Sequence, residues 1–258
     1  MLKQTPSLLS KLKNKLLKFM KKRQVVNVVE FRPWNKTVDR IIDPPVPASK
    51  MVPEWFKNLP IYTDPEFQEC MGPGGKTNLT MKACMPALDS FMTGYMLTLP
   101  CDVIFVDPAK YNNRVIWDVS WQVISSHNSK QVGGMAPHGY EPHPFKWEGV
   151  WEIHMPKGYS FLITHPFYRY ELPFITTTAV VDGDNFTRPL NLPFFLKEGF
   201  VGTIPKGTPI AQIIPIKREA WHHTVSGYDE DSQYTLDSLK SSIFRSYKDR
   251  WWNKKSYL

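Results

Sequence analysis

The sequence predicts a mainly β fold, an antiparallel sandwich or barrel, with a helix at each end. From about residue 95 onward, short segments rich in Val, Ile, Phe, Trp and Thr alternate with turns of Gly, Pro, Asn and Asp. The chain has 23 prolines, which are scattered through apolar segments and therefore disfavour long helices. Residues 5–22 and 234–250 are exceptions, because their apolar side chains repeat at helical spacing.

The first predicted helix is amphipathic and strongly basic. Thr5 and Pro6 are typical of the N-cap and the first helical position. At 100° per residue, apolar side chains fall on one face and lysines on the other. The candidate docking residues of this helix are Leu8, Leu12, Lys15, Leu16, Phe19 and Lys22. Residues 1–23 hold eight of the 32 basic residues and none of the 24 acidic ones, so the rest of the chain is formally neutral.

Such a helix has several available partners. It can pack on its own domain, bind an apolar groove of a partner protein, or lie on an anionic membrane surface. Nucleic acid is the least favoured partner, because Phe19 is the only aromatic residue available for base stacking. Partners that recognise charge are therefore expected at residues 1–23 rather than at the neutral body.

The body is predicted to contain a first strand at 25–31 and a proline-rich extended segment at 33–60. A short helix is expected at 53–59 within that segment, a loop at 64–80 and another short helix at 86–92. The remaining predicted strands are 95–106, 114–124, 147–154, 158–164, 174–181, 187–195, 199–204 and 209–216.

The C-terminal region departs from this strand pattern. Residues 222–232 are polar and predict a loop, and 234–250 predict a helix. The tail that follows is aromatic and basic, and Trp251 and Trp252 are candidate residues for docking on a partner. The resulting division is a helical arm at 1–23, a β-rich domain at 24–220 and a C-terminal loop and helical tail at 221–258.

Known catalytic and metal-binding patterns are incomplete in this chain. The histidines lack the spacing of cupin or non-haem iron sites, which leaves His138 and His143 as weak metal candidates. The segment Gly72–Thr77 lacks the spacing of a phosphate-binding loop, and no GxSxG motif occurs. We therefore predict no metal and no cofactor, and the balance of motifs leans against an enzyme.

The segment from Met155 to Pro215 carries a distinctive set of short motifs. Pro156–Tyr159 opens a strand, an apolar strand ends at Asp182 before a turn, and a closing strand contains Gln212 in the run PIAQII. This layout resembles the β-clip fold of trimeric dUTPases and dCTP deaminases. The resemblance implies that Asp182 positions or activates a water molecule and that Gln212 matches the closing-strand glutamine.

The family's phosphate-binding Arg-Ser-Ser motif has no counterpart here, because residues 164–169 read Thr-His-Pro-Phe-Tyr-Arg. The glycine-rich C-terminal flap is also replaced, by a helix and a tryptophan-rich tail. If the domain nevertheless binds a small molecule or nucleotide, Asp182 is the candidate general base and Arg169 or Arg188 the candidate anion contact.

Over a longer span, the chain also resembles a family of uncharacterised bacterial and bacteriophage proteins. The residues that carry this resemblance are Met51–Phe56, Cys84–Asp89, Gly94-Tyr95, Gln131–Gly134, Asp182 and Gly207–Gln212. The resemblance implies a compact domain and, for a phage-encoded chain, a virion or accessory component.

Cysteine use and hydropathy bear on location. Cys70, Cys84 and Cys101 form no CxxC pair and are expected to be reduced thiols in a cytoplasmic protein, or in a virion if the chain is phage-encoded. No apolar run approaches the length of about 18 residues that spans a bilayer, and no signal-peptide core is visible. The sequence thus predicts a protein that is neither secreted nor transmembrane.

Three functional hypotheses follow from these observations. The leading one is a non-enzymatic binding or assembly protein that docks on protein partners, or on copies of itself, through its terminal helices. The second is a small-molecule or nucleotide binder or hydrolase with a β-clip-like pocket at Asp182. The third is a peripheral membrane protein anchored by residues 5–22.

Overall fold

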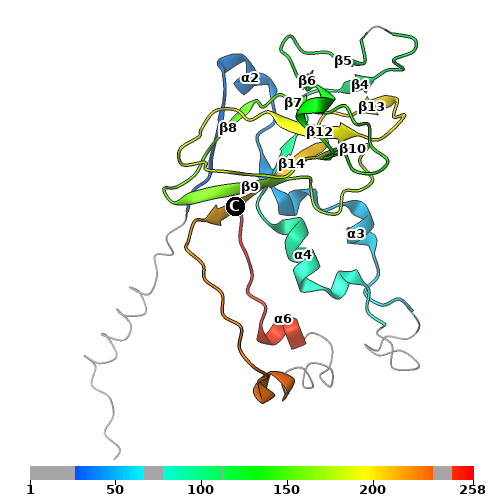
Figure 1. Cartoon of the computed structure of the whole chain (residues 1–258). Coiled ribbons are helices and arrows are strands. Elements are labelled where there is room, and N and C mark those ends of the chain that lie inside the picture. The colour runs from blue at the N-terminus through cyan, green and yellow to red at the C-terminus, as the bar shows by residue number, and fades with distance from the viewer. Residues whose placement is uncertain (1–26, 65, 67–77, 112, 235–245) are drawn as a thin grey trace, which may run out of the picture.

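A computed structural model of the chain describes residues 27–64, 66, 78–111, 113–234 and 246–258. The predicted mainly β fold is confirmed, and the described strands form four antiparallel sheets (Figure 1). The sheets have open edges, so of the two predicted architectures the closed barrel is wrong. The predicted helix at 5–22 and its docking residues lie outside the described residues.

The largest sheet has five strands, and its central strand is the last strand of the domain. Its order is β11 (Ala179–Val181), β9 (Tyr159–Thr164), β14 (Pro209–Lys217), β3 (Tyr95–Thr98) and β2 (Val46–Pro47). Strand β14 is buried at its start and exposed at its end, and it pairs with β9 from Gln212 to Lys217. The last residues of β14 therefore leave the core and reach the surface beside the start of β9.

The other sheets are smaller. A four-stranded sheet has the order β10 (Phe174–Thr176), β12 (Leu192–Leu196), β7 (Phe145–Trp147) and β6 (Ile124–Ser126). A three-stranded sheet has the order β13 (Gly202–Ile204), β4 (Val103–Phe105) and β5 (Val115–Trp117). A two-stranded sheet joins β1 (Glu30–Pro33) to β8 (Trp151–His154).

The main core lies among these sheets and is rich in aromatic side chains. Trp147 and Phe194 stack with ring centroids 3.8 Å apart, and Phe174 meets Trp147 edge-on at 5.1 Å. All three side chains are fully buried. They belong to neighbouring strands of the four-stranded sheet, where period-two alternation directs their side chains to one face.

Several predicted strands are each divided in two by the structure. The predicted strand 95–106 becomes β3 and β4 around Pro100, which has no backbone N–H to continue a ladder. The predicted strand 174–181 becomes β10 and β11, which belong to different sheets. At this crossing the Thr177 N–H bonds the Pro193 carbonyl at 2.9 Å, and the Thr178 hydroxyl bonds Thr164 at 2.8 Å.

The helices pack at one end of the five-stranded sheet and at the N-terminal strand. Helices α3 (Glu54–Asn58) and α4 (Met85–Met92) agree with the prediction and meet through Phe56 and Phe91, whose centroids lie 4.3 Å apart. Short 3₁₀ turns occur at Ala48–Met51, Met81–Ala83 and Ser129–Gln131.

Helix α2 (Lys36–Ile41) occupies a stretch for which the sequence predicted extended structure. The Asn35 side chain accepts bonds from the Thr37 and Val38 N–H groups, both at 2.9 Å, and Val38 is fully buried. This N-cap and one buried contact stabilise a helix too short to show a sequence period.

The chain beyond β14 leaves the body and then returns to it (Figure 1). All of residues 219–234 are exposed. Helix α6 (Ser246–Arg250) falls within the predicted helix at 234–250, of which residues 235–245 lie outside the described part. None of the helices that the structure describes is long and apolar enough to cross a bilayer.

Candidate functional site

Asp182, the main catalytic candidate from the sequence, lies where β11 ends in a tight turn. The Asp182 carbonyl accepts bonds from the N–H groups of Asn185 and Phe186 at 3.0 and 2.8 Å. A Cβ on Gly183 would lie 2.7 Å from Met155 and 2.8 Å from Phe161, so only glycine lets the turn pack this closely. The turn therefore holds Asp182 and Asp184 against the start of β9.

Two carboxylates and one guanidinium form a cluster at this turn. Arg218, just after β14, donates to Asp184 Oδ1 at 2.9 Å and to Asp182 Oδ1 at 3.2 Å, and its other nitrogen bonds Asp184 Oδ2. The Ser160 hydroxyl donates to Asp182 Oδ1 at 2.6 Å, and the Gly158 N–H donates to Asp184 Oδ2 at 2.8 Å. The two carboxylates differ in exposure, since the side chain of Asp184 is 8% exposed and that of Asp182 is 58% exposed.

The pairing of Asp184 with Arg218 favours the charged form of both groups. The hydrogen bond from Arg218, supported by the Gly158 N–H, lowers the pKa of Asp184 to about 2. The same bond to Asp184 raises the pKa of Arg218. A bidentate guanidinium–carboxylate pair of this kind is a strong positional constraint. We interpret it as a tie between the end of β14 and the 182–186 turn.

A shallow pocket of about 450 Å³ adjoins the cluster. It is lined by Met155, Lys157, Gly158, Asp184, Asn185 and Arg218. Asp184 and Arg218 are hydrogen-bonded to each other within this lining, which leaves Lys157 and Asn185 for a ligand. Asp182 does not line the pocket, so the candidate general base and the cavity beside it are separate features.

Gln212, the second residue of the β-clip motif, is completely buried. Its amide nitrogen donates to the carbonyls of Ser90 and Thr93 at 2.9 and 2.6 Å, and its amide oxygen accepts from the Phe167 N–H at 3.1 Å. Both amide hydrogens are used within the protein. In this conformation Gln212 joins β14 to the end of α4 and to the loop after β9, and it presents no atom to a ligand.

Neither of the candidate anion-binding arginines, Arg169 and Arg188, forms a hydrogen bond or ion pair with Asp182 within the described residues. The Arg169 side chain bonds the Glu171 carboxylate, and the backbone carbonyl of Arg169 accepts a hydrogen bond from His165 at 3.1 Å. Arg188 is exposed, and within the part of the chain that the structure describes it has no ion-pair partner.

His165 has a structural environment rather than a catalytic one. Its Nδ1 accepts the Thr176 N–H at 3.3 Å while its Nε2 bonds the Arg169 carbonyl, an assignment that follows from the two partners. Burial lowers the pKa of His165, so the ring is neutral at neutral pH.

The weak metal candidates, His138 and His143, are both exposed, and His143 packs edge-on against Phe145 at 5.9 Å. Among the residues that the structure describes, no group of three or more His, Cys, Asp or Glu side chains is arranged to hold a metal ion. Of the cysteines, Cys84 and Cys101 are free thiols, and burial raises the pKa of Cys101 to about 11.

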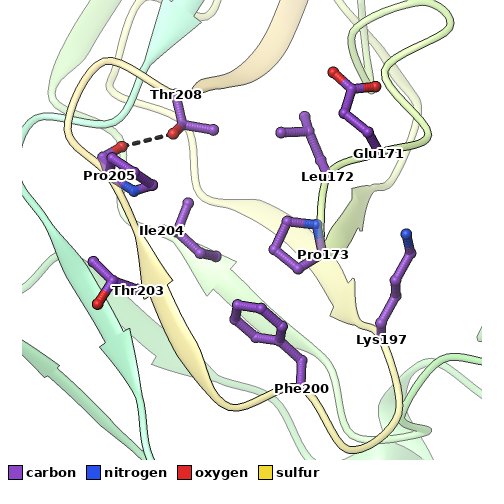
Figure 2. Close-up of a pocket in the computed structure, with 9 residues that line it drawn as sticks. All are labelled: Glu171, Leu172, Pro173, Lys197, Phe200, Thr203, Ile204, Pro205 and Thr208. Atoms are coloured by element: carbon purple, nitrogen blue, oxygen red, sulfur yellow. Dashed lines mark hydrogen bonds between the residues drawn. The ribbon is translucent and has the colours of Figure 1, made fainter.

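A second pocket, of about 360 Å³, opens between the loop before β10 and the β13–β14 turn (Figure 2). Its lining is Glu171, Leu172, Pro173, Lys197, Phe200, Thr203, Ile204, Pro205 and Thr208. In Figure 2 apolar side chains occupy the middle of the lining, with Glu171 and Lys197 to one side. The described lining holds no histidine, cysteine or paired carboxylates, so it suits an apolar group rather than hydrolytic chemistry.

The C-terminal tail docks on its own body. The Trp252 indole N–H donates to Asp89 Oδ2 at 2.9 Å, and Lys255 Nζ bonds the same oxygen at 2.6 Å. Tyr257 meets Tyr95 edge-on with centroids 6.0 Å apart. Of the two predicted docking residues, Trp252 thus binds within the chain, while Trp251 is 40% exposed.

The segment between β14 and the tail carries several large side chains that are strongly exposed. Trp221, Val225 and Tyr228 are 84, 92 and 79% exposed. Within the described residues, 220–228 form no hydrogen bond, ion pair or ring contact with the body. We call residues 219–234 the C-terminal arm; residues 219–229 have no regular secondary structure, and the backbone of 220–228 forms no hydrogen bond with the described residues.

Sequence reasoning missed Ser160, Asp184, Arg218 and Asp89. Asp184 follows Asp182 by two residues in an Asp-Gly-Asp-Asn turn, a pattern that could have drawn attention to it. Arg218 carried no sequence signal, and Asp89 appeared only as the end of the Cys84–Asp89 segment, because their partners lie 34 and 163 residues away.

No protein-family model matches this chain, and no curated protein matches it either.

Proposed function

We propose that this protein is a non-enzymatic binding and assembly protein that docks on partner chains through its terminal segments. The observation that carries the proposal is the C-terminal arm. Large side chains at Trp221, Val225 and Tyr228 are exposed, on a backbone that makes no hydrogen bond to the described part of the body.

An arm of this composition is typical of a segment that binds another chain. Tryptophan and tyrosine are enriched in protein interfaces, because each combines a large apolar area with a hydrogen-bonding group. An extended backbone with unpaired N–H and C=O groups can add to a sheet edge or lie along a partner surface. In the isolated protomer neither property is used.

The contacts of Asp182 and Gln212, the two candidate residues from the β-clip resemblance, support the same proposal. Ser160, Asp182, Asp184 and Arg218 bond one another, and Gln212 bonds backbone groups. These contacts hold β14 and its neighbours in place, which is a sufficient reason for those residue types. A virion or accessory role in a phage is a finer form of the proposal and rests on the sequence resemblance alone.

The test replaces the three apolar residues of the arm by serine: Trp221→Ser, Val225→Ser and Tyr228→Ser. The matched control carries Ile104→Ser, Tyr111→Ser and Tyr170→Ser, which are also exposed but lie on the body. Association is measured by sedimentation velocity over a range of concentrations and by cross-linking from a photoreactive residue at position 224, which is exposed and is not changed in the arm variant.

The expected result is a discrete oligomer or cross-linked adduct that the control retains and the arm variant loses. A protein with the natural arm residues that stays monomeric and forms no adduct from position 224 would overturn the proposal. So would an adduct that forms equally well from the arm variant.

A further inference from the structure

The seat of the C-terminal tail is a defined surface of the body. It consists of Asp89 on α4 and Tyr95 at the start of β3. Trp252 and Lys255 both bond Asp89 Oδ2, and Tyr257 packs on Tyr95. We call residues 251–258 the tail and this surface the seat. The side chain of Asp89 is 18% exposed, so the bonds to the tail are partly shielded from water.

The arm gives the tail a long reach. Residues 219–229 have no regular secondary structure, and at about 3.3 Å per residue such a segment can reach at most about 35 Å when fully extended. This length is comparable to the diameter of a small domain. A tail carried on such an arm can reach a seat on a neighbouring molecule as well as the seat on its own body.

We infer that the tail exchanges between two copies of this chain, so that each tail occupies the seat of the other protomer. This inference rests on the proposed assembly function and names its partner as a second copy. The seat contacts are the same in the closed and exchanged forms, which makes exchange a low-cost route to a twofold dimer. Charge also matches, because Lys255 of one copy meets the Asp89 carboxylate of the other.

The exposed arm decides between the two forms. In the closed protomer Trp221, Val225 and Tyr228 stand in water. In the exchanged dimer the two arms cross between the bodies, where these side chains can pack against each other. Burial of this apolar area favours the exchanged form, and it opposes the entropy cost of associating two protomers.

Isotope mixing distinguishes the two forms. Equal amounts of ¹⁵N-labelled and unlabelled full-length protein are mixed, incubated to equilibrium and cross-linked from a photoreactive residue at position 257. The expected result is tail–seat cross-links that join labelled to unlabelled peptides in statistical proportion. Tail–seat cross-links that join only peptides of the same label would overturn the inference.

A complementation experiment provides the second measurement. One variant loses the seat through Asp89→Ala, and the other loses the tail contacts through Trp252→Ala and Lys255→Ala. Each variant alone should dimerise less than wild type, and the mixture should recover dimer, because one tail and one seat remain intact in each mixed pair. Asp39→Ala on α2 removes an exposed helix carboxylate away from the seat and serves as the control.

The two proposals fail separately. Absence of dimer recovery in the mixture, with association still lost in the arm variant, would reject exchange and leave the assembly function standing. Mixed-label cross-links that persist in the arm variant would support tail exchange and would show that the arm is not the docking element.

Discussion

Replacing Gln212 by alanine should destabilise the protein more than any other single change to an amide side chain in the described part. The side chain is 0% exposed and bonds three backbone groups, the carbonyls of Ser90 and Thr93 and the N–H of Phe167. Each buried group left without a partner costs about 1–3 kcal/mol. Three such groups and the residual cavity predict a loss of about 3–5 kcal/mol in the free energy of unfolding.

The measurement is urea unfolding followed by tryptophan fluorescence, with the stability taken from the midpoint and the slope. Gln122→Ala is the control, because that exposed glutamine donates one long bond, 3.3 Å to the Ile124 carbonyl. The control should lose less than about 1 kcal/mol. Gln212→Glu should be as harmful as alanine, since a carboxylate cannot donate to the two carbonyls.

A loss below about 1 kcal/mol for Gln212→Ala would contradict this reasoning. It would mean that α4, β14 and the loop after β9 are not joined by this amide. The glutamine would then be free to serve a ligand, as the β-clip resemblance implies.

Three further predictions concern the cluster, a buried histidine and a glycine. The pKa of Asp184 is about 2 in the folded protein, below the value near 3.9 in the unfolded chain. Its contribution to stability is therefore complete above about pH 4 and is lost as the pH falls through 2. Asp184→Asn should lower the urea midpoint at pH 7 and make that midpoint less dependent on acid pH. Burial lowers the pKa of His165, so the unfolded chain binds the proton first, and stability should fall as the pH drops below about 6.5. His165→Gln should be less stable than the natural protein at pH 7.5. Its stability should then decline less between pH 7.5 and 5. Gly94→Ala would place a Cβ 1.9 Å from a backbone oxygen at φ +77° and should lower the melting temperature far more than Gly133→Ala, where φ is also positive but no atom lies within 4 Å.

The elements of the fold were predictable to the extent that their signals are local. The strands from residue 95 onward and the helices α3 and α4 were predicted because composition and turn residues are read within a few positions. Helix α2 was missed, because proline density outweighed the single N-cap at Asn35. The division of two long predicted strands depended on which sheet each half joined.

The candidate site was predictable only in part. Asp182 was found from a motif, and the structure places it at the predicted strand end. Its partner Arg218 could not be found, because the two meet only through the register that sets Lys217 opposite Tyr159 on β9. Gln212 was found as a motif residue, yet its role follows from backbone groups more than forty residues away.

By itself the sequence determined that the chain is mainly β, that its body is neutral and that the excess charge belongs to residues 1–23. These are sums and short-range patterns, and they need no knowledge of which segments meet. Only the tertiary structure decided that Asp182 and Arg218 share one cluster and that the Gln212 amide forms its hydrogen bonds inside the protein. It also decided that the tail, which follows an exposed arm, returns to α4. The reason is physical: pairing and burial depend on strand register and chain reversal over tens to hundreds of residues, and local propensity carries no record of them.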